Sequence, residues 1–215
     1  MKKILISLLF ISTGAFAACP ELYPNGKVLE PENTVELCNT FYVSRFDITN
    51  KAVILTSESL LRSKTFEAER TNSYKADTRL GDKTPLPSDY AYSGYDRGHM
   101  TPAGSASNEA EMRETFLMTN MTPQDASLNR GPWRVIEEKI RTQFFESNVD
   151  FKIVTIAMYN IPTKLTSGIP VPSGYWKIVY KNEIATDFYF AENKPKSPVI
   201  PYTFIDFLVK SSTLF

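Results

Sequence analysis

The only histidine in this chain of 215 residues lies among side chains that can carry out acid–base and phosphate chemistry. His99 follows Asp96, Arg97 and Gly98. Imidazole gains and loses a proton near neutral pH, and a guanidinium grips a phosphate or a carboxylate at two points. Glycine lets the backbone approach a bulky group or take a positive φ. The pattern indicates a reactive turn, although a single histidine taken alone more often has a structural role.

Two polar segments with further candidate residues follow at close spacing. The first, Phe116–Gln124, contains Asn120. The second contains Asn129, Glu137 and Arg141. Taken one at a time, these residues have ordinary explanations: an asparagine suits a turn, and Glu137 with Arg141 suits a surface pair worth a few tenths of a kcal/mol. The function must therefore be judged on the three segments together.

In this order and spacing, the three segments resemble the DNA/RNA non-specific endonucleases, the family of secreted bacterial nucleases and mitochondrial endonuclease G. The specific match covers about residues 92–141, and a weaker resemblance runs from Cys38 to roughly Asp187. The resemblance implies a ββα-metal (His-Me finger) fold and a sequence-non-specific endonuclease that hydrolyses phosphodiester bonds of DNA and RNA. Family members often have a Thr-Gly-Pro-like segment after the central strand, where this chain has Ile156–Pro162. Cleft shape and substrate preference therefore stay open.

The resemblance, together with the needs of phosphodiester hydrolysis, gives the candidate residues their roles. It makes Asn129 the ligand of a divalent metal, Mg²⁺ with Mn²⁺ able to substitute, because Mg²⁺ prefers oxygen ligands and keeps several waters. Glu137 would accept hydrogen bonds from metal-bound waters, and His99 would act as general base on the attacking water. Arg97 is assigned to phosphate contact. Arg141 is assigned to transition-state charge or to orienting Glu137.

Two residues have supporting roles, and a local set of arginines would hold the substrate. Asp96 would fix the turn or bind a metal water, and Asn120 would brace the histidine loop. Loss of Lys2 and Lys3 with a signal peptide lowers the basic count from 24 to 22, against 24 acidic residues. A protein without net positive charge must bind a polyanion through a local field. The residues expected to supply it are Arg97, Arg130, Arg134 and Arg141.

Other catalytic schemes fit the sequence less well. One histidine and two cysteines cannot build the usual tetrahedral zinc site, and the chain lacks a Gly-x-Ser-x-Gly elbow, a P-loop and a dinucleotide fingerprint. Two other function classes stay open. One is a catalytically silent nucleic-acid-binding protein on the same fold. The other is a different exported hydrolase, either a phosphodiesterase for small molecules or a serine hydrolase that uses Ser105 or Ser107.

The N-terminus has the pattern of a secretory signal. Residues 1–17 combine two lysines, the apolar run Ile4–Ile11 and a small-x-small cleavage pattern. The run is too short to span a membrane, so we expect an exported protein, periplasmic or secreted, without stable membrane association. Residues 18–215 would form a single endonuclease domain, whose oligomeric state stays open. In such a protein Cys19 and Cys38 favour a disulfide, with two free thiols as the alternative.

The chemistry needs an ordered scaffold, and the apolar pattern predicts one. Apolar residues make up 42% of the chain and charged residues 22%, which suits a packed core. Residues 70–90 read as a long ordered loop, and Phe204–Val209 as a short strand or helix. The predicted strands are Phe41–Phe46, Ala52–Thr56, Phe116–Asn120, Phe151–Met158 (buried on both faces), and the hairpin Tyr175–Tyr180 with Ile184–Phe190.

Two helices are predicted beside these strands. One spans Ser107–Leu117, with Ser107 as its N-cap. The other begins near Pro132. Its apolar stripe consists of Trp133, Ile136, Ile140 and Phe144. We expect an α+β fold in which helices pack on the faces of a central, mainly antiparallel sheet.

Overall fold

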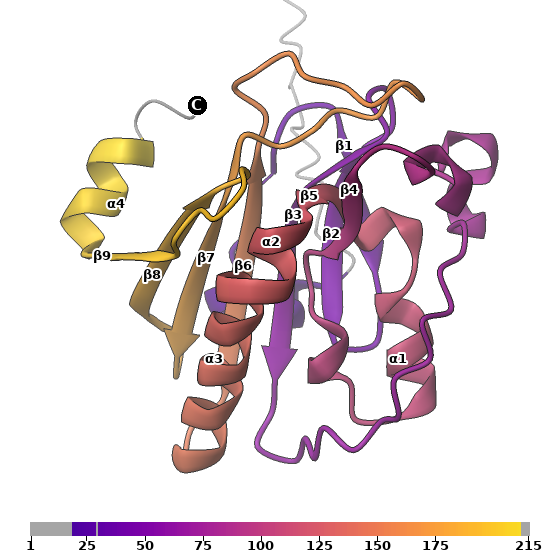
Figure 1. Ribbon diagram of the computed structural model, residues 1–215. Helices are drawn as coiled ribbons and strands as arrows, with labels where there is room; N and C mark the ends of the chain where they lie inside the picture. Colours follow the sequence, from indigo (N-terminus) through magenta and orange to yellow (C-terminus); the bar gives the residue numbers. More distant parts are fainter. Residues whose placement is uncertain (1–18, 29, 212–215) are drawn as a thin grey trace, which may run out of the picture.

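A computed structural model describes residues 19–28 and 30–211, so the predicted signal peptide lies outside the described residues (Figure 1). The main unit of this part of the chain is a seven-stranded antiparallel sheet in the order β1-β2-β3-β6-β7-β8-β9. Its strands are β1 (Thr34–Cys38), β2 (Tyr42–Asp47), β3 (Ala52–Leu60), β6 (Phe151–Met158), β7 (Gly174–Lys181), β8 (Ile184–Glu192) and β9 (Ile200–Tyr202). Because β3 pairs directly with β6, the segment 61–150 leaves this sheet, and that segment holds every residue predicted for the site.

The segment between β3 and β6 carries a two-stranded sheet and three helices. β4 (Tyr95–His99) pairs antiparallel with β5 (Met121–Asp125). α1 (Glu109–Thr115) lies in the connection between them, and α2 (Ala126–Leu128) and α3 (Arg134–Glu146) follow β5. Figure 1 shows α2 and α3 in front of the large sheet, with β4 and β5 next to them. Helices thus pack on a central antiparallel sheet, and the predicted α+β class is confirmed.

The helix α3 and the residue before it pack on the sheet through one apolar stripe. Its members Trp133, Ile136, Ile140 and Phe144 are all buried. The ring of Phe144 meets that of Phe151 on β6, with 5.5 Å between centroids. On the opposite face of β6, Val154 belongs to a second core together with Trp176 of β7. Apolar side chains are therefore buried on both faces of β6, as its nearly unbroken apolar run predicts.

The N-terminal residues and the last helix cover that second face. Leu22 and Tyr23 share the core of Val154. The helix α4 (Phe204–Ser211) follows β9, and Phe207 meets Trp176 edge to face at 5.2 Å between centroids. The final segment is thus helical, one of its two predicted forms. Within residues 19–28 and 30–211, no helix has both the length and the apolar character needed to cross a membrane.

Short helical turns connect the main elements. The 3-10 turns are Pro20–Leu22, Pro24–Gly26, Thr78–Lys83, Pro87–Tyr90, Ala103–Ser105 and Met118–Asn120, and a π-helical turn, Asn129–Trp133, joins α2 to α3. Residues 70–90 form the predicted loop and contain two of the 3-10 turns. The hairpin of β7 and β8 is also confirmed. Asn182 and Glu183 at its tip have φ of 48° and 66°, which suits the two-residue turn of a twisted hairpin.

Two predicted element boundaries are wrong. The segment Phe116–Asn120, predicted as a strand, ends in the 3-10 turn Met118–Asn120, and the strand β5 begins only at Met121. Pro123 hides β5 in the sequence, because proline is depleted from central strands; a two-stranded sheet has only edges, where it is tolerated. The strand predicted at Ala52–Thr56 is longer than expected, because β3 continues to Leu60.

The first predicted helix also starts later than expected. Ser107 is not its N-cap: the side chain of Asn108 accepts the Glu111 backbone N–H at 3.0 Å. Ser107 instead donates its backbone N–H to the Glu111 carboxylate at 2.7 Å. The Asp-Arg-Gly-His segment is not a turn either, because all four residues lie within β4.

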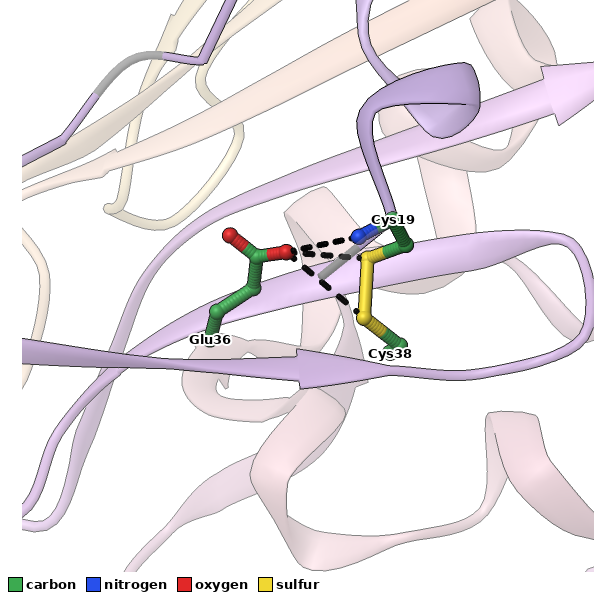
Figure 2. A group of neighbouring side chains, drawn as sticks. All are labelled: Cys19, Glu36 and Cys38. Carbon is green, nitrogen blue, oxygen red and sulfur yellow. Dashed lines mark hydrogen bonds between the residues drawn. A yellow bond between two sulfur atoms is a disulfide. The ribbon is translucent and has the colours of Figure 1, made fainter. Parts of the chain in front are cut away.

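A disulfide joins Cys19 to Cys38 and so attaches the N-terminal residues to β1 (Figure 2). Glu36 lies beside it: its Oε1 accepts the Cys19 backbone N–H at 3.2 Å, and its Oε2 lies 3.0 Å from Arg45 Nη1. Among the described residues, Cys19, Glu36 and Cys38 form the one group of three or more cysteine, histidine or acidic side chains that lie close enough together to hold a metal ion. Bridged sulfurs are not thiolate ligands, so we place no metal there.

Candidate active site

The fold brings most of the predicted site residues to one cavity of about 350 Å³. The predicted residues that line it are Arg97, His99, Asn129, Arg130, Arg134, Glu137 and Arg141. They come from β4, the π-helical turn and the first two turns of α3. Asp96 and Asn120 do not line this cavity. Asp96 instead contacts two residues that line it, Asn129 and Arg130. Asn120 contacts Met100 and Thr101, which directly follow His99 in the chain.

The β4 strand presents two cavity residues on one face because Arg97 and His99 are two residues apart. A side chain at Gly98, between them, would point to the opposite face of the sheet, toward the Gln124 side chain of β5. A Cβ at Gly98 would lie 2.2 Å from Gln124 Oε1, far inside contact distance. Of the two roles that the sequence left open for this glycine, the structure therefore selects close approach to a bulky group rather than a positive φ.

His99 is held by packing. Its ring meets Phe116 edge to face, with 4.8 Å between centroids and an interplanar angle of 89°. Nε2 is buried and finds no hydrogen-bond partner among the described residues. Burial, with a smaller effect from the Arg70 guanidinium, lowers the pKa of His99 to about 3. The imidazole is therefore neutral at pH 7, the form that can accept a proton.

Asn120 fixes the chain immediately after the histidine. Its Oδ1 accepts the backbone N–H of Thr101 at 2.9 Å, and its Nδ2 donates to the carbonyls of Thr101 and Thr115, each at 2.9 Å. Its own backbone carbonyl accepts the N–H of Met100 at 2.9 Å. A fully buried amide with its polar atoms paired holds one backbone geometry. This arrangement is the one expected of a brace for the histidine segment.

Asp96 connects β4 to the π-helical turn. Its Oδ2 accepts Asn129 Nδ2 at 2.9 Å and Arg130 Nε at 2.8 Å, and its Oδ1 accepts Arg130 Nη2 at 2.5 Å. Burial raises the pKa of Asp96, but the hydrogen bonds from Arg130 and Asn129 outweigh burial and lower it below the usual value. The ionised carboxylate can only accept, so the amide nitrogen of Asn129 must face it. The carbonyl oxygen of Asn129 is left for another partner.

Glu137 has a different partner from the one its spacing suggests. Lys177 on β7 places its Nζ 3.6 Å from Glu137 Oε1, and this ammonium is 1% exposed. Nζ also donates to Thr155 Oγ1 at 2.9 Å. Burial raises the pKa of Glu137, while Lys177 and Arg141 act in the opposite direction. Glu137 Oε1 itself is buried and has no hydrogen-bond partner among the described residues.

Arg141 reaches the cavity because of a glycine. A Cβ at Gly104 would lie 3.0 Å from Arg141 Cζ, so a larger residue would displace the guanidinium. The arginine shares a small buried space with Glu58, Glu137 and Lys177. Burial raises the pKa of Glu58 to about 7, against the opposing effect of Lys177. Beneath the cavity floor there is therefore a cluster of buried ionisable groups.

Two of the predicted substrate arginines are already paired within the protein. Arg130 holds Asp96, although its side chain is 73% exposed. Arg134 pairs with Glu138 one turn along α3 and donates from Nε to the Arg130 carbonyl at 3.2 Å. Both line the cavity rim. A bound phosphate would have to share or replace these contacts.

Sequence reasoning missed four residues of this region. Arg70 and Tyr74 enter the cavity from the loop 70–90, and the Arg97 guanidinium lies 4.4 Å from the centroid of the Tyr74 ring. Lys177 and Glu58 support the cavity from β7 and β3. For Arg70 and Tyr74, the length and predicted order of the loop were the features of the sequence that could have indicated a functional role. Nothing local marks a lysine or a glutamate inside an apolar strand as part of a distant site.

The residues fit a hard divalent cation. The carbonyl oxygen of Asn129 is left available by Asp96, and Glu137 lines the same cavity. An amide oxygen and a carboxylate are ligands of the type that Mg²⁺ takes, directly or through water. The fit rests on these oxygens, since the described residues place one imidazole and no thiolate at the cavity.

Comparison with known proteins settles the family. The sequence model of the DNA/RNA non-specific endonucleases matches residues 23–206. The chain belongs to this family. A chain from the solved EndoG/EndoGI complex superposes on this structure with a TM-score of 0.72 and a sequence identity of 21%. The superposition covers 91% of this chain and 88% of the other. That likeness confirms the expected ββα-metal fold.

Several nucleases resemble this family member in sequence. A nuclease of Nostoc sp. strain PCC 7120 is 36% identical over 115 residues, covering 52% of this chain and 42% of the relative. A nuclease of Serratia marcescens is 28% identical over 142 residues, with coverages of 59% and 53%. The human mitochondrial nuclease EXOG is 32% identical over 152 residues, with coverages of 64% and 41%. The chain thus spans about half the length of the curated relatives that it matches.

Proposed function

We propose that this protein is an exported, Mg²⁺-dependent, sequence-non-specific endonuclease that hydrolyses phosphodiester bonds of DNA and RNA. One observation carries the proposal: a neutral imidazole, an oriented amide oxygen and a buried carboxylate line one arginine-rich cavity. They belong to His99, Asn129 and Glu137. Family membership and the named nuclease relatives support the same activity. Mn²⁺ should replace Mg²⁺, because it takes the same oxygen ligands.

In this function each side chain does what its surroundings allow. His99 accepts a proton from the attacking water, for which its neutral ring is suited. Asn129 would hold the cation through its carbonyl oxygen, and Glu137 would hold the waters of that cation. When bound, the cation supplies a Lewis acid that stabilises the charge of the phosphate and of the leaving 3′-oxygen.

The arginines of the cavity would neutralise the negative charge of the substrate. Arg97, Arg70 and Arg141 reach the cavity from three different parts of the chain. Arg141 belongs to the cluster of buried ionisable groups and is assigned to the negative charge that develops on the phosphoryl oxygens in the transition state. Contacts to the phosphate backbone carry no sequence information, which agrees with non-specific cleavage.

Export to the periplasm or the medium is part of the proposal. Its support is the signal-like N-terminus together with the Cys19–Cys38 disulfide, because such bonds form and persist in oxidising compartments.

Digestion of a supercoiled plasmid, a single-stranded DNA and an RNA tests the proposal. We expect all three to be cleaved with Mg²⁺ or Mn²⁺ and none with EDTA. His99→Ala should lower the turnover on the order of 10²- to 10⁴-fold, and Asn129→Ala should also weaken Mg²⁺ binding in calorimetry. Ser105→Ala and Ser107→Ala serve as controls and should keep the metal-dependent activity.

Three outcomes would contradict the proposal. Full cleavage in EDTA that is lost in Ser105→Ala or Ser107→Ala would favour a serine hydrolase. Binding of DNA without any cleavage in Mg²⁺ or Mn²⁺ would favour a silent binding protein. A His99→Ala variant that keeps more than half of the wild-type rate would remove the imidazole from the chemistry.

A further inference from the structure

A second cavity, of about 490 Å³, adjoins the catalytic one. Arg70, Arg97 and Asn129 are among the residues that line both, so the two cavities share a wall. We propose that this second cavity binds the nucleotide next to the scissile phosphate, with Tyr92 stacking on its base. The inference rests on the proposed function, because it names the subsite beside that catalytic cavity.

The side chain of Tyr92 is exposed to solvent and does not pack in the core. Its relative exposure is 106%, as high as a side chain can reach in an open chain, whereas Tyr90 two residues earlier is 4% exposed. Tyr90 also donates its hydroxyl to the Met121 carbonyl at 3.1 Å. The segment thus buries one tyrosine as an anchor and holds the other in solvent at the cavity rim.

The backbone at Tyr92 has an unusual conformation. Its φ is +55°, a conformation that bulky residues rarely adopt. Gly94, two residues later, also has a positive φ, of 79°. Strained backbone of this kind persists where the surrounding structure over-determines it, and it gathers at binding sites. Phe66 has the same φ of 55°, but its ring packs against Phe144, whereas the ring of Tyr92 is fully exposed.

The charges of the cavity complete a nucleotide site. The guanidinium of Arg97 lies at the boundary with the catalytic cavity, stacked on Tyr74 at 4.4 Å. A flat cation on one side and an exposed aromatic ring on the rim match the phosphate and the base of one nucleotide. Stacking accepts every base, because each has a π-face, so this subsite adds affinity without sequence preference.

The subsite favours substrates whose bases are free to unstack. In a duplex the bases face one another, and stacking on Tyr92 requires that one of them leave the helix. Single strands and frayed ends present bases without that cost. The proposal therefore predicts that removal of the ring weakens binding of single strands more than binding of duplexes.

An end-labelled single-stranded oligonucleotide with one abasic residue tests the subsite. With wild-type protein, cleavage should fall about 5- to 100-fold at the linkage that places the abasic residue in the second cavity, the effect expected for one lost stack. Tyr92→Asn keeps a residue that tolerates positive φ but removes the ring. It should raise KM with little change in kcat and erase the local dip in cleavage. Tyr92→Trp should restore the dip.

Binding measured in EDTA, by anisotropy of the same labelled strands, separates this proposal from the proposed function. Wild type should bind the intact strand about 5- to 100-fold more tightly than Tyr92→Asn does, whether or not cleavage occurs. Equal affinities, or a cleavage dip that persists in Tyr92→Asn, would overturn the subsite. If Mg²⁺ supports no cleavage by wild type while affinity still depends on Tyr92, the subsite stands and the catalytic proposal fails. Thermal unfolding of Tyr92→Asn at or above the wild-type temperature confirms that it folds.

Discussion

Asp96 Oδ2 accepts a hydrogen bond from Asn129 Nδ2 at 2.9 Å, across 33 residues of sequence. The contact turns the amide so that its oxygen, not its nitrogen, is available at the cavity. Asp96 also binds Arg130 through two nitrogens. Its predicted place, fixing a turn or binding a metal water, becomes that of a residue that orients the candidate metal ligand.

Asp96→Asn should therefore weaken use of the metal. Loss of such an orienting partner typically costs 10- to 100-fold in metal affinity, so the Mg²⁺ concentration for half-maximal cleavage should rise by about that factor. Calorimetric titration with Mg²⁺ should show the same change. Arg130→Gln is the matched control, because it removes the other partner of Asp96 and leaves the Asn129 contact in place. Superimposable Mg²⁺ titrations of wild type and Asp96→Asn would contradict the orienting role.

Lys177→Met should destabilise the protein severely. Its buried ammonium faces Glu137 at 3.6 Å, and removal of one partner from a buried pair costs about 3–5 kcal/mol because the other charge stays behind. Lys181→Met on the same strand is the control. Lys181 pairs with Asp187 at 3.0 Å but is 29% exposed, so its loss should cost less than about 1 kcal/mol. Urea unfolding of the two variants measures the difference, and equal losses would mean that the Lys177 pair contributes no more than a surface pair.

Gly98→Ala should destabilise β4 by about 1–3 kcal/mol, the usual cost of forcing an atom into a packed site. The added Cβ would meet Gln124 Oε1 at 2.2 Å. It would also meet Gln124 Cβ at 2.5 Å, so only Gln124→Gly removes both contacts. The Gly98→Ala substitution should therefore cost much less in the Gln124→Gly background than in wild type. Thermal unfolding of wild type, the two single variants and the double variant gives a double-mutant cycle. If the effects of the two substitutions are additive, this contact is not the reason for the glycine.

Glu58→Gln should change how stability depends on pH. Burial raises the pKa of Glu58 to about 7 from an ordinary value of 4.5, so between these values the folded state holds a proton that the unfolded state has lost. Wild-type stability is therefore lost as pH rises from 4.5 through 7. Glutamine does not titrate, so the variant should not lose this stability. The unfolding free energy of the variant minus that of wild type should therefore rise by on the order of 2 kcal/mol between pH 5 and pH 8. Urea titrations at the two pH values would disprove the shift if the difference stayed constant.

Local patterns predicted much of the scaffold. The period of the stripe from Trp133 to Phe144 predicted the face of α3 that packs on the sheet, and the apolar run Phe151–Met158 predicted a strand buried on both faces. Both follow from periodicity within one element, where neighbours in sequence are neighbours in space. β5 escaped prediction because its proline is acceptable only at an edge, and edges are set by the whole sheet.

The sequence alone determined the family of this protein and the candidate residues His99, Asn129 and Glu137, because their motif is compact in the chain. Only the tertiary structure decided what surrounds them. Lys177 meets Glu137, Arg70 lines the same cavity as His99, and Asp96 binds Asn129, and each of these arrangements brings together distant segments of the chain. Burial, which shifts the pKa values of the site, is likewise a property of the packed chain and of no single residue.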